Sequence, residues 1–340
     1  MVETEKSWLI TGITGQDGSW FADYLLKLGY TNIHGIIRRS STLNTSNIDH
    51  IFDKLKLHHG DLTDSMNIHS IISKVKPDYI VNFAAQSHVK VSHSIESYTM
   101  MTNTMGILYI LQSVRELGLK NCKIYHASTS EMFGNETNGE TMLSESSPMH
   151  PVSIYGISKL AAQNICNMYR DAFNMFVVSS VLFNHEGPRR GKTFVTRKIV
   201  DHVVRKKNNE NFQPLRLGNL NAKRDWGDAE DYMKAVYLMM MQPKPNNYVI
   251  ASGETHSVRE FVEEAYRAIG VEIEWSGTGE NEKGINKSSK ELLVIVDPMY
   301  YREIDIDCLI GDASKARDEL GWKPQVTFKD LVRNMVNECK

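Results

Sequence analysis

The chain has 340 residues, with 39 basic and 41 acidic side chains, so it is long enough for a large core and for one large domain with a smaller second one. The balanced charge argues against a nucleic-acid partner, and no apolar run approaches the ~20 residues of a membrane helix. Its four cysteines form no CxxC pair or metal spacing and its short acidic start contains no signal peptide, so we expect a cytoplasmic protein.

The first expected elements surround a glycine-rich turn. Residues 8–11 are mainly apolar, Gly12, Gly15 and Gly18 follow at three-residue spacing, and residues 19–26 are amphipathic, an order that predicts strand, tight turn and helix. Such a turn lets the backbone approach a pyrophosphate, and the helix N-terminus adds N–H groups and partial positive charge. The spacing differs from the dinucleotide fingerprint GxGxxG, and a flexible loop is the alternative interpretation. We expect a phosphate cradle formed by Gly12, Thr14, Gly15, Gln16, Asp17 and Gly18.

The second expected strand, residues 32–37, leads into Arg38, Arg39 and Ser40. At this place an acidic residue usually binds the ribose 2′-hydroxyl of NAD, whereas an arginine suits the 2′-phosphate of NADP. Two arginines without a carboxylate therefore predict NADP as the cofactor. A solvated basic loop is the alternative interpretation.

Two further strands complete this half of the expected cofactor site. The third strand ends at Asp61 and Leu62, which are candidates for binding the adenine. The fourth begins at Tyr79, and the nicotinamide half would pass the residues at its end, Phe83, Ala84, Ala85 and Ser87. Adjacent histidines on a strand face opposite ways, so His58 and His59 predict no metal site.

Strand–helix alternation continues to about residue 182. The apolar stretch 107–111 is expected in the core or in a subunit contact, and strands are expected at 122–128 and 176–182 around a helix from about 155 to 173. This alternation predicts an α/β fold, a Rossmann-type doubly wound parallel sheet with helices on both faces. We place the cofactor-binding domain at 1–182, with returning segments near 226–256, and a smaller, mainly substrate-binding α/β region at 183–340. The lysine-rich stretch 281–290 predicts a mobile loop.

Tyr155 and Lys159 are a candidate catalytic pair. Residues i and i+4 share one face of a helix, so the Lys159 ammonium can lie near the Tyr155 phenol. A cation at roughly 6 Å, with an effective dielectric of ~20, is worth ~2.8 kcal/mol, or about two pKa units. That shift would bring a phenol of pKa ~10 toward the range of a base for a sugar hydroxyl. An ordinary tyrosine and lysine on a surface helix is the alternative interpretation.

Taken together, these features resemble the GDP-mannose 4,6-dehydratase family of the extended short-chain dehydrogenase/reductase superfamily over the whole chain. The matching segments are residues 12–18, 38–41, 128–134, 155–159, 184–191, 217–219, 224–229 and 321–324. Two departures stand out. Gly187 replaces the usual serine, which is expected to loosen its loop. Residues 302–307 lack the usual arginine-proline run with a glutamate further on. Asp305 would then take the role of that glutamate, and the affinity for the nucleotide-sugar would be altered.

The resemblance implies a reaction and four catalytic residues. Tyr155 would deprotonate the C4 hydroxyl of the sugar, while NADP⁺, held partly by Lys159, accepts the hydride. Glu131 would remove the C5 proton and protonate the leaving C6 oxygen, and Thr129, two residues earlier on an extended segment, would hydrogen-bond the C4 oxygen. Hydride return to C6 would give GDP-4-keto-6-deoxy-mannose, and the reversible chemistry of Tyr155 would allow a secondary reduction of this 4-keto product. The alternative role of Glu131 is to cap the next turn.

The resemblance also implies the remaining binding residues, with a homo-oligomer (dimer or tetramer) and no nucleic-acid or membrane partner. Tyr98, His185 and Arg190 would lie on the cofactor side. An arginine pair suits a diphosphate because each guanidinium can bind two oxygens, and a surface arginine is the alternative for each. The residues assigned to the GDP-mannose substrate are Ser87, Asn184, Lys198, Leu217, Gly218, Arg224, Arg302 and Asp305.

Two rival functions use the same fold. A nucleotide-sugar 4-epimerase or 4-keto reductase would keep Tyr155 and Lys159 but needs no base at C5, so Glu131 separates it from a dehydratase. A non-enzymatic NADP-sensing protein belongs to a different class, and such a protein would be expected to lose the catalytic residues. The absence of C6 deoxygenation would favour the first rival.

Overall fold

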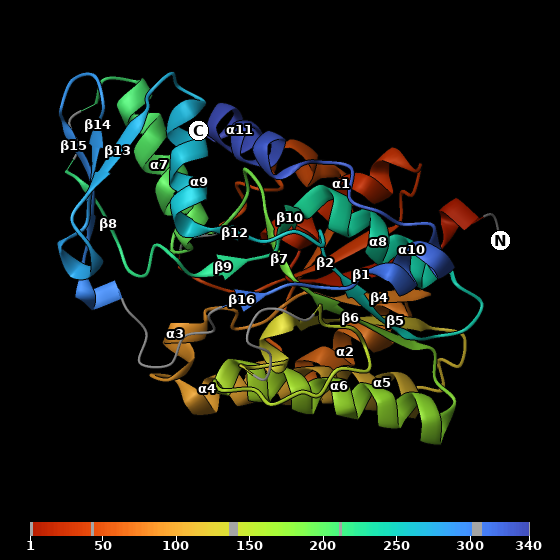
Figure 1. Cartoon of the computed structure of the whole chain (residues 1–340). Helices are drawn as coiled ribbons and strands as arrows, with labels where there is room; N and C mark the ends of the chain where they lie inside the picture. The colour runs from red at the N-terminus through yellow and green to blue at the C-terminus, as the bar shows by residue number, and fades with distance from the viewer. Residues whose placement is uncertain (1–2, 42–43, 136–141, 211–212, 301–307, 340) are drawn as a thin grey trace.

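The computed structural model describes residues 3–41, 44–135, 142–210, 213–300 and 308–339 (Figure 1). Arg302 and Asp305, which were assigned to the substrate, lie outside the described residues. Among the helices of these ranges, none combines the length and apolar character that crossing a membrane requires.

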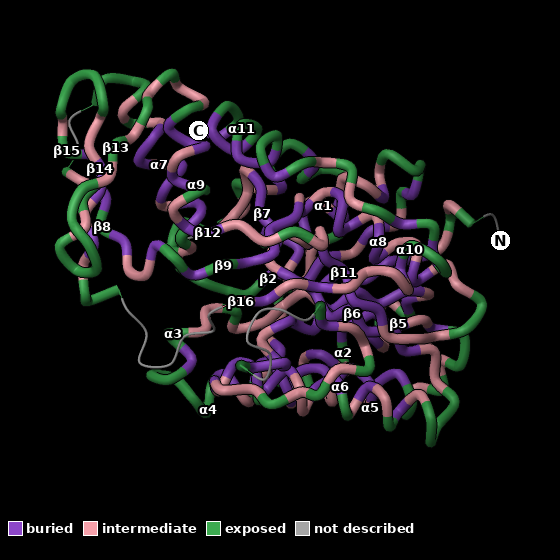
Figure 2. The backbone as a smooth tube through the Cα atoms, viewed as in Figure 1, coloured by how far each residue is buried: buried purple, intermediate pink, exposed green. Residues whose placement is uncertain are grey.

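A parallel sheet of seven strands forms the centre of the molecule, in the order β11-β6-β5-β4-β1-β2-β3. This arrangement confirms the predicted Rossmann-type doubly wound sheet. Parallel sheets are covered on both faces, and most strands are buried accordingly (Figure 2), while the edge strand β3 is partly exposed. The strands are β1 (Trp8–Thr11), β2 (Ile33–Ile37), β3 (Lys56–His59), β4 (Tyr79–Asn82), β5 (Lys123–Thr129), β6 (Val177–Leu182) and β11 (Asn247–Ile250).

Helices cover the two faces of this sheet and close two apolar cores (Figure 1). One face carries α1 (Gln16–Lys27), α8 (Ala229–Met241) and α10 (Ser314–Leu320), and the other carries α2 (Ser65–Val75), α5 (Gly106–Glu116) and α6 (Ile154–Phe173). Within the predicted apolar stretch, Ile107, Ile110 and Leu111 are buried in the second core.

The segment that leads into the apolar stretch 107–111 is helical but interrupted. The helix α4 (Glu96–Met100) continues through a π-helical turn, η3 (Met101–Met105), into α5, and a short helix α3 (Val89–Ser92) precedes it. Such π-turns are rare and frequently occur at functional sites. Here the turn faces α6, because the Asn103 amide donates to Ser158 Oγ at 3.0 Å.

The region after residue 183 builds a second sheet of order β13-β14-β15-β8, covered by α7 (Val195–Lys207), α9 (Val258–Arg267) and α11 (Phe328–Glu338). Its strands are β8 (Leu215–Leu217), β13 (Ile273–Ser276), β14 (Lys283–Asn286) and β15 (Leu292–Val296). The prediction of a mobile loop at 281–290 is therefore wrong for its central part. The lysines that suggested it are paired, because Lys287 and Lys290 reach Glu272 and Glu274 at 2.9 and 2.7 Å.

Short strands join the two regions (Figure 1). β7 (Asn184–Glu186) pairs with β10 (Trp226–Asp228), and β9 (Lys223–Arg224) lies between β12 (His256–Ser257) and β16 (Cys308–Leu309). These strands have two or three residues each, so they display no hydrophobic period in the sequence.

Candidate active site

A cavity of about 920 Å³ opens at the carboxyl ends of the central strands, where doubly wound folds bind their ligands. Most of the predicted site residues line it, from both regions of the chain. These are Gly12, Thr14, Gly15, Gln16, Asp17, Gly18, Arg38, Asp61, Leu62, Phe83, Ala84, Ala85, Ser87, Tyr98, Thr129, Glu131, Tyr155, Lys159, Asn184, His185, Arg190, Lys198, Leu217, Gly218 and Arg224.

Arg39 and Ser40 do not line the cavity, although the sequence grouped them with Arg38. Arg39 is exposed, and its guanidinium donates to the carbonyl of Ser40. Arg38 instead lines the cavity and donates from Nη1 to the Tyr98 hydroxyl at 2.7 Å. Successive residues after a strand point in different directions, so only one of the two adjacent arginines faces the cavity.

The glycine turn brings bare backbone to the cavity. Gly12 has a φ of +69°, and a Cβ there would lie 2.8 Å from the backbone nitrogen of Ala84. A Cβ on Gly18 would lie 2.3 Å from the carbonyl oxygen of Gly12, so a side chain is excluded at both places. Gly15 precedes α1 without a side-chain cap, which leaves the first N–H groups of the helix to a ligand. These features fit the pyrophosphate of a dinucleotide.

An ion pair lies beside this turn and joins it to β7. His185 Nε2 is 3.1 Å from Asp17 Oδ1, and His185 Nδ1 lies 2.8 Å from the carbonyl of Phe183. Burial opposes the charge of Asp17, but His185 and Arg190 outweigh it and hold the pKa of that carboxyl below its usual value. Burial likewise disfavours a charged His185, but the Asp17 carboxylate raises the pKa of the imidazole. Each group therefore favours the charged form of the other.

Arg190 is held on the same side of the cavity by a buried carboxylate. Its Nε lies 3.0 Å from Glu186 Oε2, which also accepts from Thr196 Oγ1 at 2.5 Å. The guanidinium covers the ring of Phe194 at 3.7 Å. Glu186 and Phe194 both line the cavity and were not identified from the sequence.

Tyr155 and Lys159 lie in the first turns of α6, on the cavity wall. Ser153 caps this helix, since its Oγ accepts from the N–H of Gly156 at 3.0 Å, and the helix begins one residue before Tyr155. The predicted pairing of these two residues on one helix face is present. The helix thereby brings the phenol and the ammonium to one cavity.

The predicted effect of Lys159 on Tyr155 is wrong for this structure. Burial raises the pKa of Tyr155 to about 12, and a hydrogen bond with the Thr129 side chain only partly opposes that rise. Lys159 Nζ donates to the carbonyl of Ala127 at 2.7 Å, and burial lowers its own pKa to about 8. The i, i+4 spacing fixes the helix face, but a carbonyl on β5 determines where the ammonium points.

Thr129 and Glu131 follow at the end of β5, and the prediction of an extended segment there is wrong. Residues Ser130–Met132 form a 3₁₀ turn, and Thr129 is its N-cap, with Oγ1 accepting from the N–H of Glu131 at 3.3 Å. The alternative role considered for Glu131 was to cap this turn, but Thr129 is the residue that caps it. Both side chains still reach the cavity, and the charge of Glu131 acts to raise the pKa of Tyr155.

The second region supplies further residues that line the cavity. Lys198 of α7 has its Nζ 4.7 Å from the centre of the Tyr300 ring, and Arg224 lies buried in β9. Arg216, which the sequence analysis missed, also lines the cavity and pairs with Asp297 at 3.1 Å. It directly precedes the Leu217-Gly218-Asn219 segment, and that position was its only signal in the sequence.

Asn47 is another cavity residue that the sequence analysis missed. Its Nδ2 donates to the carbonyl of Thr14 at 3.0 Å, so it supports the glycine turn from outside. It lies 29 residues after Gly18 without a motif of its own, and only folding brings the two segments together.

Solved structures support the fold. The Thermus thermophilus UDP-glucose 4-epimerase complex with NAD has a TM-score of 0.81 at 23% identity and covers 98% of each chain. The dTDP-glucose 4,6-dehydratase DesIV from Streptomyces venezuelae, with NAD bound, reaches 0.82 at 24% identity, covering 98% of this chain and 96% of its own. RMD from Pseudomonas aeruginosa, complexed with NADPH, reaches 0.78 at 21% identity, covering 98% and 97%.

Sequence comparison is more specific. The GDP-mannose 4,6 dehydratase of Drosophila melanogaster is 48% identical over 98% of this chain and 85% of its own length, and the human enzyme is 48% identical over 97% and 90%. The Vibrio cholerae serotype O1 enzyme is 43% identical over 98% and 93%. A family model described as GDP-mannose 4,6 dehydratase matches residues 9–335. The resemblance inferred from the motifs is confirmed, and the chain belongs to the GDP-mannose 4,6-dehydratase family.

Proposed function

We propose that this protein converts GDP-mannose to GDP-4-keto-6-deoxy-mannose, as a carbon–oxygen lyase that uses a nicotinamide dinucleotide. The observation that carries the proposal is the common cavity wall formed by Tyr155, Lys159, Thr129 and Glu131. A phenol and a carboxylate thus line the same cavity as the basic side chains of Lys198 and Arg224. Family membership and the glycine turn support the same function.

The catalytic residues divide the reaction between them. When bound, the dinucleotide supplies the hydride acceptor for C4, the hydride donor for C6 and a positive charge. Tyr155 takes the proton of the C4 hydroxyl, and Thr129, already bonded to the phenol, holds the C4 oxygen. A C4 ketone acidifies the C5 proton, so Glu131 can remove that proton and deliver one to the C6 oxygen as the C–O bond breaks. Water leaves with the proton that came from C5, and the proton that C5 regains at the end is balanced by the one that Tyr155 took from the C4 hydroxyl.

The positive charge of the pocket is needed at the first of these steps. Since burial holds the pKa of Tyr155 near 12, the phenol is protonated at neutral pH in the free protein. Each added cation favours the phenolate, and Arg190 already acts in this direction. A bound nicotinamide ring, which carries a positive charge, would act in the same direction as Arg190.

The proposed cofactor is NADP. Arg38 lines the cavity beside Tyr98, and a guanidinium gains charge-assisted bonds of about 1.5–3 kcal/mol each from a phosphate. Changing Arg38 to Ala should narrow the preference for NADP over NAD by roughly tenfold or more. The matched variant Arg39→Ala should change it less, because Arg39 faces the Ser40 carbonyl. Dissociation constants for both dinucleotides measure this, and equal affinities in the wild type would overturn the assignment.

Mass spectrometry tests the function directly. GDP-mannose incubated with the protein and NADP⁺ should lose one water, whereas a 4-epimerase would return an isomer of unchanged mass. Product held afterwards with excess NADPH tests the secondary reduction. If the 4-keto product is unchanged after incubation with NADPH and a large molar amount of the enzyme, the secondary reduction is ruled out.

A further inference from the structure

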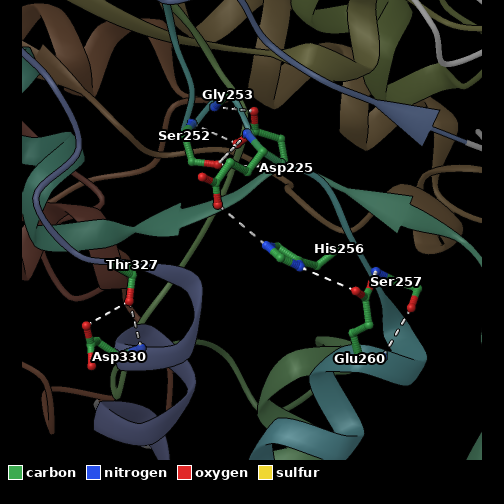
Figure 3. A network of polar contacts seen from close by, with 9 residues as sticks. Asp225, Ser252, Gly253, His256, Ser257, Glu260, Thr327 and Asp330 are labelled. Atoms are coloured by element: carbon green, nitrogen blue, oxygen red, sulfur yellow. Dashed lines mark hydrogen bonds and ion pairs between the residues drawn. The ribbon is translucent and has the colours of Figure 1, made fainter.

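Asp225 is a buried carboxylate that the proposed mechanism does not use. It is fully buried in the link from β9 to β10 and accepts four hydrogen bonds from residues that the structure describes. Its Oδ1 accepts from the N–H and the hydroxyl of Ser252 at 2.7 and 2.6 Å (Figure 3). Its Oδ2 accepts from the N–H groups of Gly253 and Gly311 at 2.9 and 3.2 Å. Burial raises the pKa of this carboxyl, and the bonds from Ser252 and the backbone oppose the rise.

The donors come from two separate parts of the fold. Ser252 and Gly253 lie two and three residues after β11, the edge strand of the central sheet, while Gly311 lies two residues after β16. The N–H of Asp225 itself donates to the carbonyl of Leu309 at 3.1 Å. Asp225 therefore fastens the end of the central sheet to the three-stranded sheet β12-β9-β16.

Arg224, the preceding residue, lies in the middle strand of that small sheet. It pairs with His256 on one side and with Leu309 on the other, and its Nη1 donates to the carbonyl of Lys223 at 2.8 Å. This hydrogen bond fixes the guanidinium to the backbone of β9, and Arg224 lines the cavity. Any shift of β9 relative to the central sheet would move it away from the wall that carries Tyr155.

The far edge of the small sheet is fixed by other contacts. The His256 ring stacks on Phe328 at 3.7 Å, with an angle of 10° between the planes. Ser257 and Glu260 form a reciprocal cap at the start of α9 (Figure 3). β12 is therefore anchored to the second region, whereas Asp225 anchors β9 and β16 to the first.

We propose that Asp225 is a positioning residue, which holds the Arg224 guanidinium where it binds the diphosphate of the nucleotide-sugar. This inference rests on the proposed function, since it takes a nucleoside diphosphate as the ligand of that arginine. A guanidinium binds a phosphate through two parallel hydrogen bonds and therefore needs its place and orientation set in advance. A carboxylate with four donors is suited to this, because it has acceptor sites for each of them.

The test compares binding of GDP and of guanosine to the full-length protein. Asp225→Asn keeps the shape of the side chain but turns an N–H₂ group toward donors, so β9 should shift. We expect the dissociation constant for GDP to rise tenfold or more, while that for guanosine, which lacks the diphosphate, stays within twofold. In an Arg224→Ala background, Asp225→Asn should add nothing further, as expected for residues that act through one another.

Asp231→Asn is the matched control. Asp231 is also buried and accepts from the N–H groups of Gln325 and Val326 at 2.7 and 3.0 Å, but it lies on α8 and is not adjacent to Arg224. It should lower the melting temperature and leave GDP binding unchanged. Should Asp225→Asn fail to fold, Ser252→Ala removes one of the four bonds and should weaken GDP binding by a smaller factor.

Two results would overturn the inference. One is unchanged GDP binding in folded Asp225→Asn, and the other is an equal loss for GDP and guanosine, which indicates a merely structural role. Failure of the proposed function looks different, because the wild type itself would then not bind GDP or release water from GDP-mannose.

Discussion

Glu131 and Tyr155 share a cavity wall, and their separate roles can be tested on one substrate. Changing Glu131 to Gln should leave C4 oxidation intact and block elimination, with a loss of 10²–10⁴-fold in rate, about 3–5 kcal/mol of barrier. With GDP-mannose deuterated at C4, the wild-type product should carry the label at C6. The variant should accumulate NADPH absorbance without the 6-deoxy product. Dehydration at the wild-type rate would show that another carboxylate acts at C5.

Gly187 lies close to two buried polar atoms, Gln16 Oε1 and Trp20 Nε1, which have no hydrogen-bond partner among the described residues. A Cβ at Gly187 would lie 3.7 Å from each, an ordinary contact, and its φ is not in the left-handed region. Changing Gly187 to Ser should therefore stabilise the protein by about 1–2 kcal/mol, through one or two buried hydrogen bonds and a stiffer unfolded chain.

The control for this change is Gly187→Ala, which adds the Cβ without the hydroxyl. Urea unfolding should give Ala a smaller gain, about 0.4–1 kcal/mol, from chain entropy alone. Equal gains for Ser and Ala would show that the hydroxyl reaches neither Gln16 nor Trp20.

At the scale of single residues, motifs identified most of the cavity wall but not its electrostatics. Spacing alone placed Tyr155 and Lys159 on one helix face, and the glycine turn needed only local geometry. The pKa of Tyr155 could not be predicted, because it depends on burial and on the choice of the Lys159 ammonium between the phenol and the Ala127 carbonyl. The orientation of the Lys159 ammonium is set by a carbonyl group that is distant in sequence.

At the scale of elements, the π-turn η3 joins the segment after β4 to α6, the helix that carries Tyr155 and Lys159. Asn103, 1% exposed, accepts from the N–H of Gln86 at 2.8 Å and donates to its carbonyl at 3.0 Å, besides its bond to Ser158. Changing Asn103 to Ala leaves these buried groups unpaired. We expect a loss of about 2–4 kcal/mol in the free energy of unfolding, since each unpaired group costs about 1–3 kcal/mol.

This prediction is checked by urea unfolding with Asn164→Ala as the control, an exposed asparagine on α6. The control should change stability by less than about 0.5 kcal/mol. A similar small effect of Asn103→Ala would show that solvent replaces its hydrogen bonds.

Strands and helices with a full hydrophobic period were predicted close to their observed bounds, as with the helix expected at 155–173 and found at Ile154–Phe173. The π-turn gave no signal, because a helix with one extra residue in a turn has nearly the same sequence pattern. The hairpin of β13 and β14 was missed for another reason. Its charged side chains are exposed, and two lysines that follow β14 pair with glutamates at the start of β13 or just before it. Composition alone cannot distinguish this arrangement from a solvated loop.

At the scale of the whole molecule, the pair of Asp17 on α1 and His185 on β7 predicts a dependence of stability on pH. The pKa of His185 is raised above 6.5, so its contribution is fully present below pH 6.5 and is lost as pH rises through the raised value. The pKa of Asp17 is lowered below 3.8, so its contribution is present above pH 3.8 and is lost as pH falls through the lowered value.

His185→Gln keeps an N–H donor but cannot become charged. Its stability deficit relative to the wild type, measured by urea unfolding between pH 4 and 9, should be largest between pH 4 and 6.5 and should shrink at alkaline pH. A deficit that is constant across the range would mean that the loss comes from packing on Tyr232, whose ring stacks on His185 at 4.9 Å.

The chain's return into its first half has a consequence for how the molecule opens. After β6 the chain forms β7, α7 and β8 of the second region, and then α8 and β11, which belong to the central sheet and its cover. It next forms α9 to β15 of the second region, then α10 on the central sheet, and it ends in α11. The central-sheet region is completed only by α10, and the second region only by α11, which lies near the end of the chain. Local opening should therefore propagate across both halves as one cooperative unit. A nucleotide that touches only the second half should slow amide hydrogen exchange deep in the central sheet, far from any atom it contacts.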